Sequence, residues 1–431
     1  MLNSNPDSSL LETTTFHIFK MNLRFKETTF FVRVFTSLSF VTGALSLTGP
    51  AAAQERFKPN EAQVVLPSSV HAQGARDGSL RALDKAWRAQ PKDLDASLAY
   101  ARAVFSTGVR EGDLRWFGSA KAALAPWWLS TDLPAEGLFL RGLVKQGFHD
   151  FEGGLKDIDS AIAKEPARPE FWSWRFALHL LQADMTAARQ DCEEMARLFG
   201  PQEAAVYRAI LLYRTGQGQA AAEMLQTLVR APEMQNASSQ DWLGFHLGEA
   251  LRVAGQPQRA IAVWDKQLKA SPQSHLLRLS LAELLNQQGQ FRQAKLIAST
   301  PEPSDALLMQ ALLASRGLQD GEQAKLAALV DARFQSQALR QESLIERPRL
   351  VYLIGYGKDP AAGLALSVDN WKLQKEPPDA VLFAQAALAA NQPRTAEPVV
   401  SWAEKTAYTE PQLKLLIGQL KAHPRWTGGA K

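Results

Sequence analysis

A set of small and apolar residues recurs in this chain at an interval of 34 residues. The interval relates Leu247, Gly248, Leu251, Gly255 and Ala260 to Leu281, Ala282, Leu285, Gly289 and Ala294. A fixed period of about 20 to 50 residues is typical of stacked-repeat proteins, in which each unit buries its apolar face against its neighbours. We therefore expect one extended array in place of several separate globular domains.

Each period encodes two helices and the turn between them. Leu247 and Leu251 fall on one face of a first helix at i, i+4 spacing, and Gly248 leaves room there for a neighbouring helix. Gly255 can end this helix in a left-handed conformation, and Pro257 suits the first turn of the next helix. The hairpin turn is thus encoded locally.

The stretch that ends at Pro272 resembles the tetratricopeptide repeat. The residues that carry the resemblance are Gly244, Leu247, Gly248, Leu251, Ala260, Trp264 and Pro272. Gly244 and Leu251 depart from the family pattern, which has aromatic residues at both positions. The resemblance implies that Ala260 and Trp264 are the small and large contacts of the second helix. It also implies a right-handed superhelix whose first helices line a concave groove, and a binding module that can take many partners.

The same signals extend along most of the chain. Gly142 and Pro166 are separated by the same 24 residues as Gly248 and Pro272. Three further pairs of helices are predicted at 307–334, 350–371 and 380–402, with a last helix at 410–422. The sequence therefore predicts an all-α fold, an α-α superhelix of about eight to nine tetratricopeptide-like hairpins over 79–422, with a tail at 423–431.

The N-terminal residues 1–53 have the pattern of an export signal. Basic residues precede an apolar run at 34–47, and Ala51, Ala52 and Ala53 provide a small-residue cleavage site. Translation can begin at Met1 or at Met21, and 54–78 is predicted to be an extended arm. The apolar run is short for a membrane anchor. We expect a periplasmic or secreted protein with a Gram-negative export signal and no stable membrane span after cleavage.

Composition and motif searches do not favour catalysis or nucleic-acid binding. The net charge is only +4 and no basic block is present, so no nucleic-acid partner is expected. No catalytic, metal-binding or cofactor-binding motif occurs. Cys192 falls at the position equivalent to Trp264 and is expected to be a buried hydrophobe, while Asp157 and Asp159 are expected to be solvated. We therefore do not expect the protein to be an enzyme, and we expect no catalytic residues and no metal or cofactor site.

The family's groove positions identify candidate binding residues. They are Trp242, Phe245, Glu249, Arg252, Leu276, Leu279, Glu283, Asn286 and Tyr213. Exposed rings would anchor a protein or peptide partner, and the charges would set its register. Packing between repeats is an alternative role for Phe245 and Leu279.

The abundance of tryptophan leaves a second function open. The chain has 11 Trp residues, and Trp172 and Trp174 lie two apart on a predicted helix. Because two such rings cannot face one seam, at least one is expected to reach the groove or a partner. The first hypothesis is an exported scaffold that binds a protein or peptide. The alternative is a carbohydrate- or peptidoglycan-associated accessory protein of the envelope, since aromatic faces also bind sugars.

Overall fold

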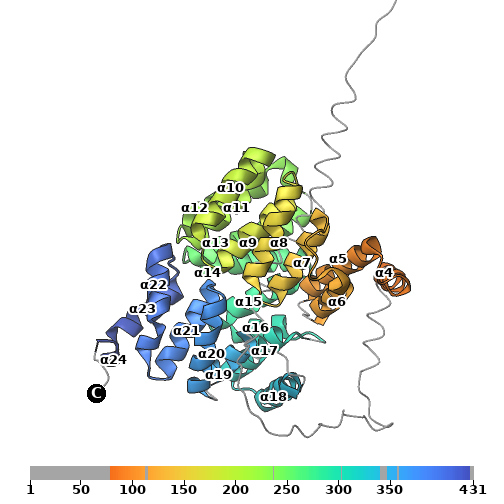
Figure 1. Ribbon diagram of the computed structural model, residues 1–431. Helices are drawn as coiled ribbons and strands as arrows, with labels where there is room; N and C mark the ends of the chain where they lie inside the picture. Colours follow the sequence, from red (N-terminus) through yellow and green to blue (C-terminus); the bar gives the residue numbers. More distant parts are fainter. Residues whose placement is uncertain are drawn as a thin grey trace, which may run out of the picture.

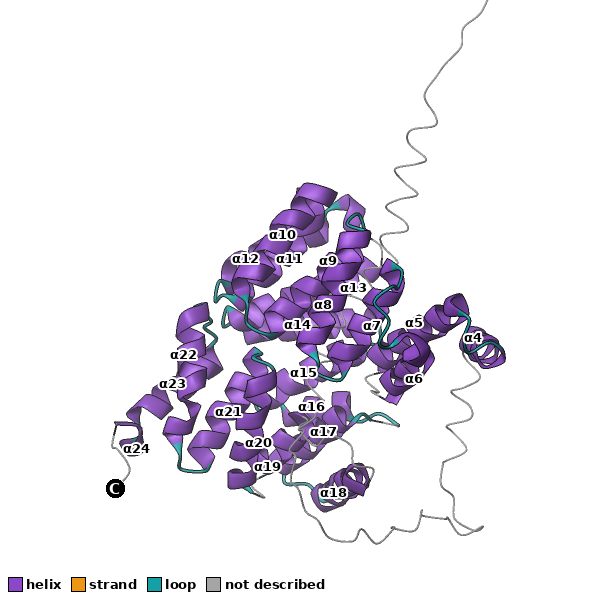
Figure 2. Cartoon of the chain, viewed as in Figure 1, coloured by secondary structure: helices purple, strands orange, loops and turns teal. Residues whose placement is uncertain are grey.

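The computed structural model describes residues 78–427, except 112–114, 236, 302, 340–346 and 357–358. The expected export segment, nearly all of the expected arm and the last four residues of the tail lie outside the described residues. Regular secondary structure in the described part of the chain consists of helices alone, as Figure 2 shows.

Helix α4 (Gly78–Ala89) precedes a series of helical hairpins (Figure 1). The hairpins of the first half pair α5 (Leu94–Glu111) with α6 (Arg115–Leu124), α7 (Ala135–Gly147) with α8 (Phe151–Lys164), α9 (Pro169–Leu181) with α10 (Met185–Phe199), and α11 (Pro201–Arg214) with α12 (Gly218–Arg230). Short 3-10 turns, η2 (Ala125–Trp127) and η3 (Pro232–Met234), follow α6 and α12.

The second half continues the same arrangement. Its hairpins pair α13 (Ala237–Val253) with α14 (Pro257–Ala270), α15 (His275–Gln287) with α16 (Phe291–Ala298), α17 (Asp305–Leu318) with α18 (Gln323–Leu339), α19 (Arg347–Gly355) with α20 (Pro360–Leu373), and α21 (Pro377–Ala389) with η4 (Pro393–Ala396) and α22 (Glu397–Thr406). Helices α23 (Pro411–Ala422) and α24 (Pro424–Thr427) end the array. The prediction of an all-α solenoid of helical hairpins is confirmed.

The hairpin of α13 and α14 shows why the repeat pattern needs its residue types. Trp264 is fully buried, and its indole Nε1 donates a hydrogen bond to the Phe245 carbonyl at 3.1 Å. A Cβ atom at Gly248 would collide with the same indole ring. The small and large residues are therefore complementary, and neither can change size without moving a helix.

A left-handed residue recurs at the turn inside successive hairpins. These residues are His149, Ala183, Gly216, Gly255, Gly289, Gln319 and Asn391. The φ of Gly255 is 72°, as expected for a glycine that ends a helix. Ala183 adopts a φ of 60° although a Cβ disfavours this region. The turn geometry is thus a property of the repeat, and the repeat accepts strain where glycine is missing.

The apolar core runs along the array as a seam. Phe176, Tyr207 and Trp242, from three successive first helices, are in ring contact at centroid distances of 5.4 and 5.6 Å. Cys192 is 2% exposed in this seam, as expected for a small hydrophobe. The seam joins neighbours in sequence, so it explains how the array is held together repeat by repeat.

One acidic residue that was expected to be solvated is buried. Asp157 on α8 accepts two hydrogen bonds of 2.7 Å from Arg141 on α7, and Lys145 lies 2.8 Å from the same carboxylate. The guanidinium of Arg141 also donates to the carbonyls of Trp127 and Ser130. The prediction for Asp157 is wrong because this carboxylate faces a basic residue of the partner helix, which helical spacing within α8 does not reveal.

The end of the chain returns to the first helices of earlier repeats. In Figure 1 the blue helices α21 to α23 lie beside the green part of the array that contains α13. The Lys375 amide donates to the Leu181 carbonyl at 2.9 Å, and the Arg214 guanidinium pairs with Glu376 at 3.1 Å. We call residues 374–411 the closing arm, because they close the superhelix on itself.

Candidate functional site

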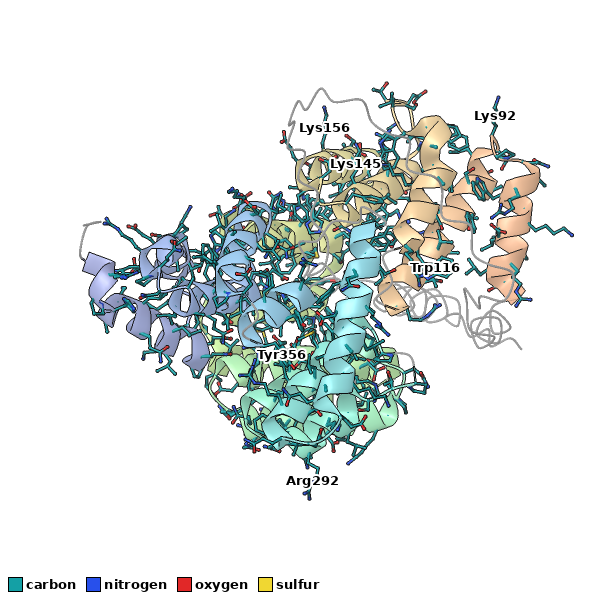
Figure 3. All side chains as sticks on the ribbon, turned by 90° about the horizontal axis from the view of Figure 1, so that it is seen from below. Lys92, Trp116, Lys145, Lys156, Arg292 and Tyr356 are labelled. Atoms are coloured by element: carbon teal, nitrogen blue, oxygen red, sulfur yellow. The ribbon has the colours of Figure 1, made fainter. Side chains whose placement is uncertain are left out.

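A cavity of about 590 Å³ lies inside the second half of the superhelix. One wall consists of the end of α13 with α15, the start of α16 and α17. The other wall consists of α19, α21 and α23. Figure 3 places Tyr356, which follows α19, among the helices near the middle of the molecule, whereas Arg292 on α16 points away from it. The cavity itself lies between two walls that come from separate stretches of the chain.

Amide side chains dominate the polar part of the cavity lining. They are Asn286, Gln287, Gln310, Gln319, Gln385 and Gln412. Asn286 Nδ2 donates to both the backbone carbonyl and the side-chain oxygen of Gln310 at 2.9 Å. This contact ties α15 to α17 and fixes the orientation of both amides. Each amide group can donate and accept hydrogen bonds, so the lining is suited to a ligand that also does both.

The cationic side chains of the lining are held by carboxylates or carbonyls. Arg347 lies 3.0 Å from Asp379 and 3.5 Å from Glu376. Burial disfavours the charged form of Arg347, but the nearby carboxylates, including Glu283, raise its pKa nonetheless. Arg316 donates to the Gly355 carbonyl. The cavity is thus polar without a strong excess of positive charge.

Three of the nine predicted groove residues line the cavity. Arg252, Glu283 and Asn286 come from the ends and middle of α13 and α15. Arg252 pairs with Glu249 on its own helix and with Glu410 of the closing arm. These three are the members of the predicted set that the structure brings to one hollow surface.

The other six predicted groove residues are buried. They are Tyr213, Trp242, Phe245, Glu249, Leu276 and Leu279, each 9% exposed or less. Tyr213 shares a hydrogen bond of 2.9 Å with His246 Nδ1, and the Phe245 ring stacks near Trp264. The expectation that the aromatic residues of this set are exposed is wrong. Successive first helices pack directly on one another, and the closing arm covers what remains.

The expectation for the tryptophan pair on α9 is also wrong. Trp172 is 7% exposed and Trp174 is 1% exposed. Trp172 Nε1 donates to the Pro166 carbonyl, while Trp174 packs edge-on against Phe139 of α7. Two rings that cannot share a seam are both buried because α9 has a neighbour on each side.

A buried network of charges was not predicted from the sequence. Arg214 and Arg252, near the ends of α11 and α13, pair with Glu376 and Glu410 of the closing arm. Burial raises the pKa of Glu376, although Arg214 and Arg347 oppose this. The pairs join residues 162 and 158 positions apart. Glu376 and Glu410 are each followed by proline, but the same dipeptide also occurs at 165–166, 302–303 and 397–398, so it gave no specific signal.

The described residues offer little for catalysis. They contain no group of three or more His, Cys, Asp or Glu side chains arranged to hold a metal ion. Burial raises the pKa of the Cys192 thiol to about 12, so the thiolate that nucleophilic chemistry needs is disfavoured. Nor does this part of the chain include a helix with the length and apolarity to cross a membrane.

Comparison with known proteins gives structural similarity alone. No family model matches the chain, and no curated protein matches it in sequence. A tetratricopeptide repeat protein from Parabacteroides merdae has 16% identity and a TM-score of 0.40 over 57% of this chain and 94% of that chain. Human IFIT1, solved as a dimer with m7Gppp-AAAA, has 13% identity and a TM-score of 0.38 over 78% of this chain and 87% of that chain.

The fold itself is described by the geometry of the repeats. The hairpins have the small and large contacts of Gly248 and Trp264, a left-handed turn at Gly255, and seams between successive first helices. With these features, the chain is a tetratricopeptide-like helical-repeat protein.

Proposed function

We propose that this chain is an exported periplasmic scaffold that binds an extended segment of a protein partner in the cavity between α13–α17 and α19–α23. The observation that carries the proposal is the amide-rich lining of a cavity of about 590 Å³. The pattern at 1–53 supports the export part of the proposal.

The chemistry of the lining matches a peptide backbone. An extended peptide presents unpaired N–H and C=O groups in alternation, and amide side chains can pair with both. Leu313, Val351 and Leu382 add apolar surface between the amides. Such surface can take alternate side chains of a bound peptide and give the site its selectivity.

The charges of the lining favour a peptide over a polyanion. Arg252 and Arg347 are already paired with carboxylates, and Glu283 and Glu410 also line the cavity. A phosphate-rich ligand would have to displace these carboxylates or lie beside them. Nucleic-acid binding usually relies on an excess of unpaired Lys and Arg.

Within the cavity, the aromatic residues favour a peptide over a glycan. A sugar-binding platform needs an open ring face, but Trp172, Trp174 and Trp264 are buried in the seams. Phe291 is the one aromatic residue of the cavity lining, and its ring packs over Gly317. The test below also measures glycan binding, so that this alternative can be compared directly with peptide binding.

The test compares two leucine-to-arginine variants. Leu313→Arg places a charged side chain in the cavity, whereas Leu296→Arg changes a residue that is 75% exposed on α16. Peptides selected from a random library on the parent protein should bind Leu296→Arg normally and Leu313→Arg at least tenfold more weakly. Circular dichroism of both variants checks that the fold is retained.

Muropeptides and cell-wall oligosaccharides are titrated into the same three proteins. Peptides that bind both variants equally would place the site elsewhere. The glycan alternative would replace the peptide proposal if no peptide is selected and if oligosaccharides bind the parent protein but not Leu313→Arg.

A further inference from the structure

Gln319, which follows α17, has a left-handed backbone with a φ of 53°. The turns after α11, α13 and α15 have glycine in this conformation, namely Gly216, Gly255 and Gly289. Glycine adopts positive φ freely, whereas a Cβ atom disfavours it. The backbone at Gln319 is therefore strained in a kind of turn that glycine would form without strain.

The strained turn is held by the residue that follows it. Asp320 Oδ2 accepts a hydrogen bond from Lys295 Nζ at 2.6 Å, and Asp320 Oδ1 accepts one from the Ser315 hydroxyl. The backbone amide of Glu322 also donates to Oδ1, at 3.1 Å. A strained conformation persists only where the surrounding contacts over-determine it, and such places are concentrated at binding sites.

The side chain of Gln319 contributes no hydrogen bond to the fold. It is exposed and lines the cavity, and its amide is bonded to no other residue that the structure describes. Two other strained turn residues differ from it, because the His149 ring is buried and Ala183 has no polar side-chain group. Gln319 thus breaks a local backbone rule with no hydrogen bond inside the protein to offset the strain, and such exceptions point to a functional role.

Unpaired amides lie on both walls of the cavity. Gln287 ends α15, Gln385 lies on α21 and Gln412 lies on α23, and these side chains also lack a hydrogen bond to the described residues. By contrast, Asn286 and Gln310 are bonded to each other. An extended peptide between the two walls would present N–H and C=O groups to the unpaired amides.

We propose that Gln319 determines binding in the cavity by pairing with the main chain of the bound peptide. Its Oε1 accepts a hydrogen bond from a peptide N–H, and its Nε2 can donate to a peptide carbonyl. Binding of the peptide then offsets the backbone strain that the free protein carries. The assignment rests on the proposed function and adds the residue that contacts the main chain of the ligand.

A matched pair of variants separates loss of the amide from relief of strain. Gln319→Gly and Ala183→Gly each replace a left-handed residue by glycine, which adopts the turn readily, so both proteins should fold. Only Gln319→Gly removes an amide from the cavity lining. A fluorescein-labelled peptide selected from a random library on the parent protein should bind Ala183→Gly normally. It should bind Gln319→Gly about fivefold more weakly or worse, the loss expected for one hydrogen bond.

An ester scan of the same peptide tests for contact with its main chain. Each backbone N–H is replaced in turn by an ester oxygen, which removes one donor. At one position the ester should weaken binding to the parent and to Ala183→Gly about fivefold and leave binding to Gln319→Gly unchanged. The proposal is overturned if no position depends on Gln319 in this way, or if the two glycine variants bind the peptide equally.

Leu313→Arg separates failure of this proposal from failure of the proposed function. Peptides that Leu313→Arg weakens and Gln319→Gly does not would refute the role of Gln319 alone. If Leu313→Arg weakens no selected peptide, the proposed function fails and the role of Gln319 fails with it. Should circular dichroism show that Gln319→Gly is unfolded, Gln319→Ala takes its place in the same titrations, since it keeps the strain of the parent and lacks the amide.

Discussion

The contact between Gly248 and Trp264 gives a prediction in which one substitution changes sign. In the parent protein, Gly248→Ala should destabilise the fold because its Cβ collides with the buried indole of Trp264. Overpacking of this kind costs about 1–3 kcal/mol. Trp264→Ala should cost about 3–5 kcal/mol for the cavity, with about 1 kcal/mol more for the Phe245 carbonyl, which loses its donor.

In the Trp264→Ala background the indole is absent, so the new Cβ meets no collision. Gly248→Ala then changes only the helix propensity of a position inside a helix. There alanine is more stable than glycine by about 1 kcal/mol. Gly248→Ala should therefore stabilise the Trp264→Ala protein while destabilising the parent. The coupling energy of the cycle should be on the order of 2–4 kcal/mol.

Urea denaturation followed by circular dichroism measures the four proteins of this cycle. Because an array can unfold in stages, hydrogen exchange of α13 and α14 should accompany the melts. Gly248→Ala with the same effect in both backgrounds would refute the claim that these two residues form one complementary contact.

Two further predictions concern acid stability and export. Burial lowers the pKa of His149 from 6.5 to about 3, so its neutral form is favoured on folding and stability is lost as the pH falls below 6.5. Asparagine tolerates the φ of 60° at this position. His149→Asn should therefore reduce the loss of folding stability between pH 6.5 and 5 by about 2 kcal/mol. Urea denaturation at several pH values measures this difference. If the free energy of unfolding of His149→Asn fell with pH as steeply as that of the parent, His149 would not contribute to the acid sensitivity. For export, N-terminal sequencing of the protein from a bacterial envelope should start at Gln54, and an intact Met1 or Met21 would contradict cleavage.

The features that the sequence predicts well are those set by neighbours within about one repeat. Gly255 marks the turn, and the spacing of Gly248 and Trp264 identifies two helices that approach closely. These contacts depend on residue size and local backbone conformation, which short-range patterns report directly. Hairpin succession along the chain was predictable for the same reason.

The exposure of the first helices depends on the curvature of the whole array. Whether Trp242 or Phe245 meets solvent is decided by the angle between repeats and by the closing arm, which no local spacing specifies. The network around Arg214 and Glu376 joins segments 162 residues apart, so a single sequence gives no indication that they meet. The cavity was found only in part, through Arg252, Glu283 and Asn286, because its second wall comes from the returning helices.

The return of the closing arm changes how this protein should fold. A solenoid with contacts only between neighbours can nucleate anywhere and grow in either direction. Here the Arg252–Glu410 pair closes a loop of 158 residues, at an entropic cost on the order of 4–5 kcal/mol that local contacts do not incur. The contact between the closing arm and the earlier repeats should therefore form last, after the individual hairpins have formed. Folding of the C-terminal helices is then coupled to folding of the earlier repeats. A destabilising substitution near α11 should therefore slow the docking of the closing arm.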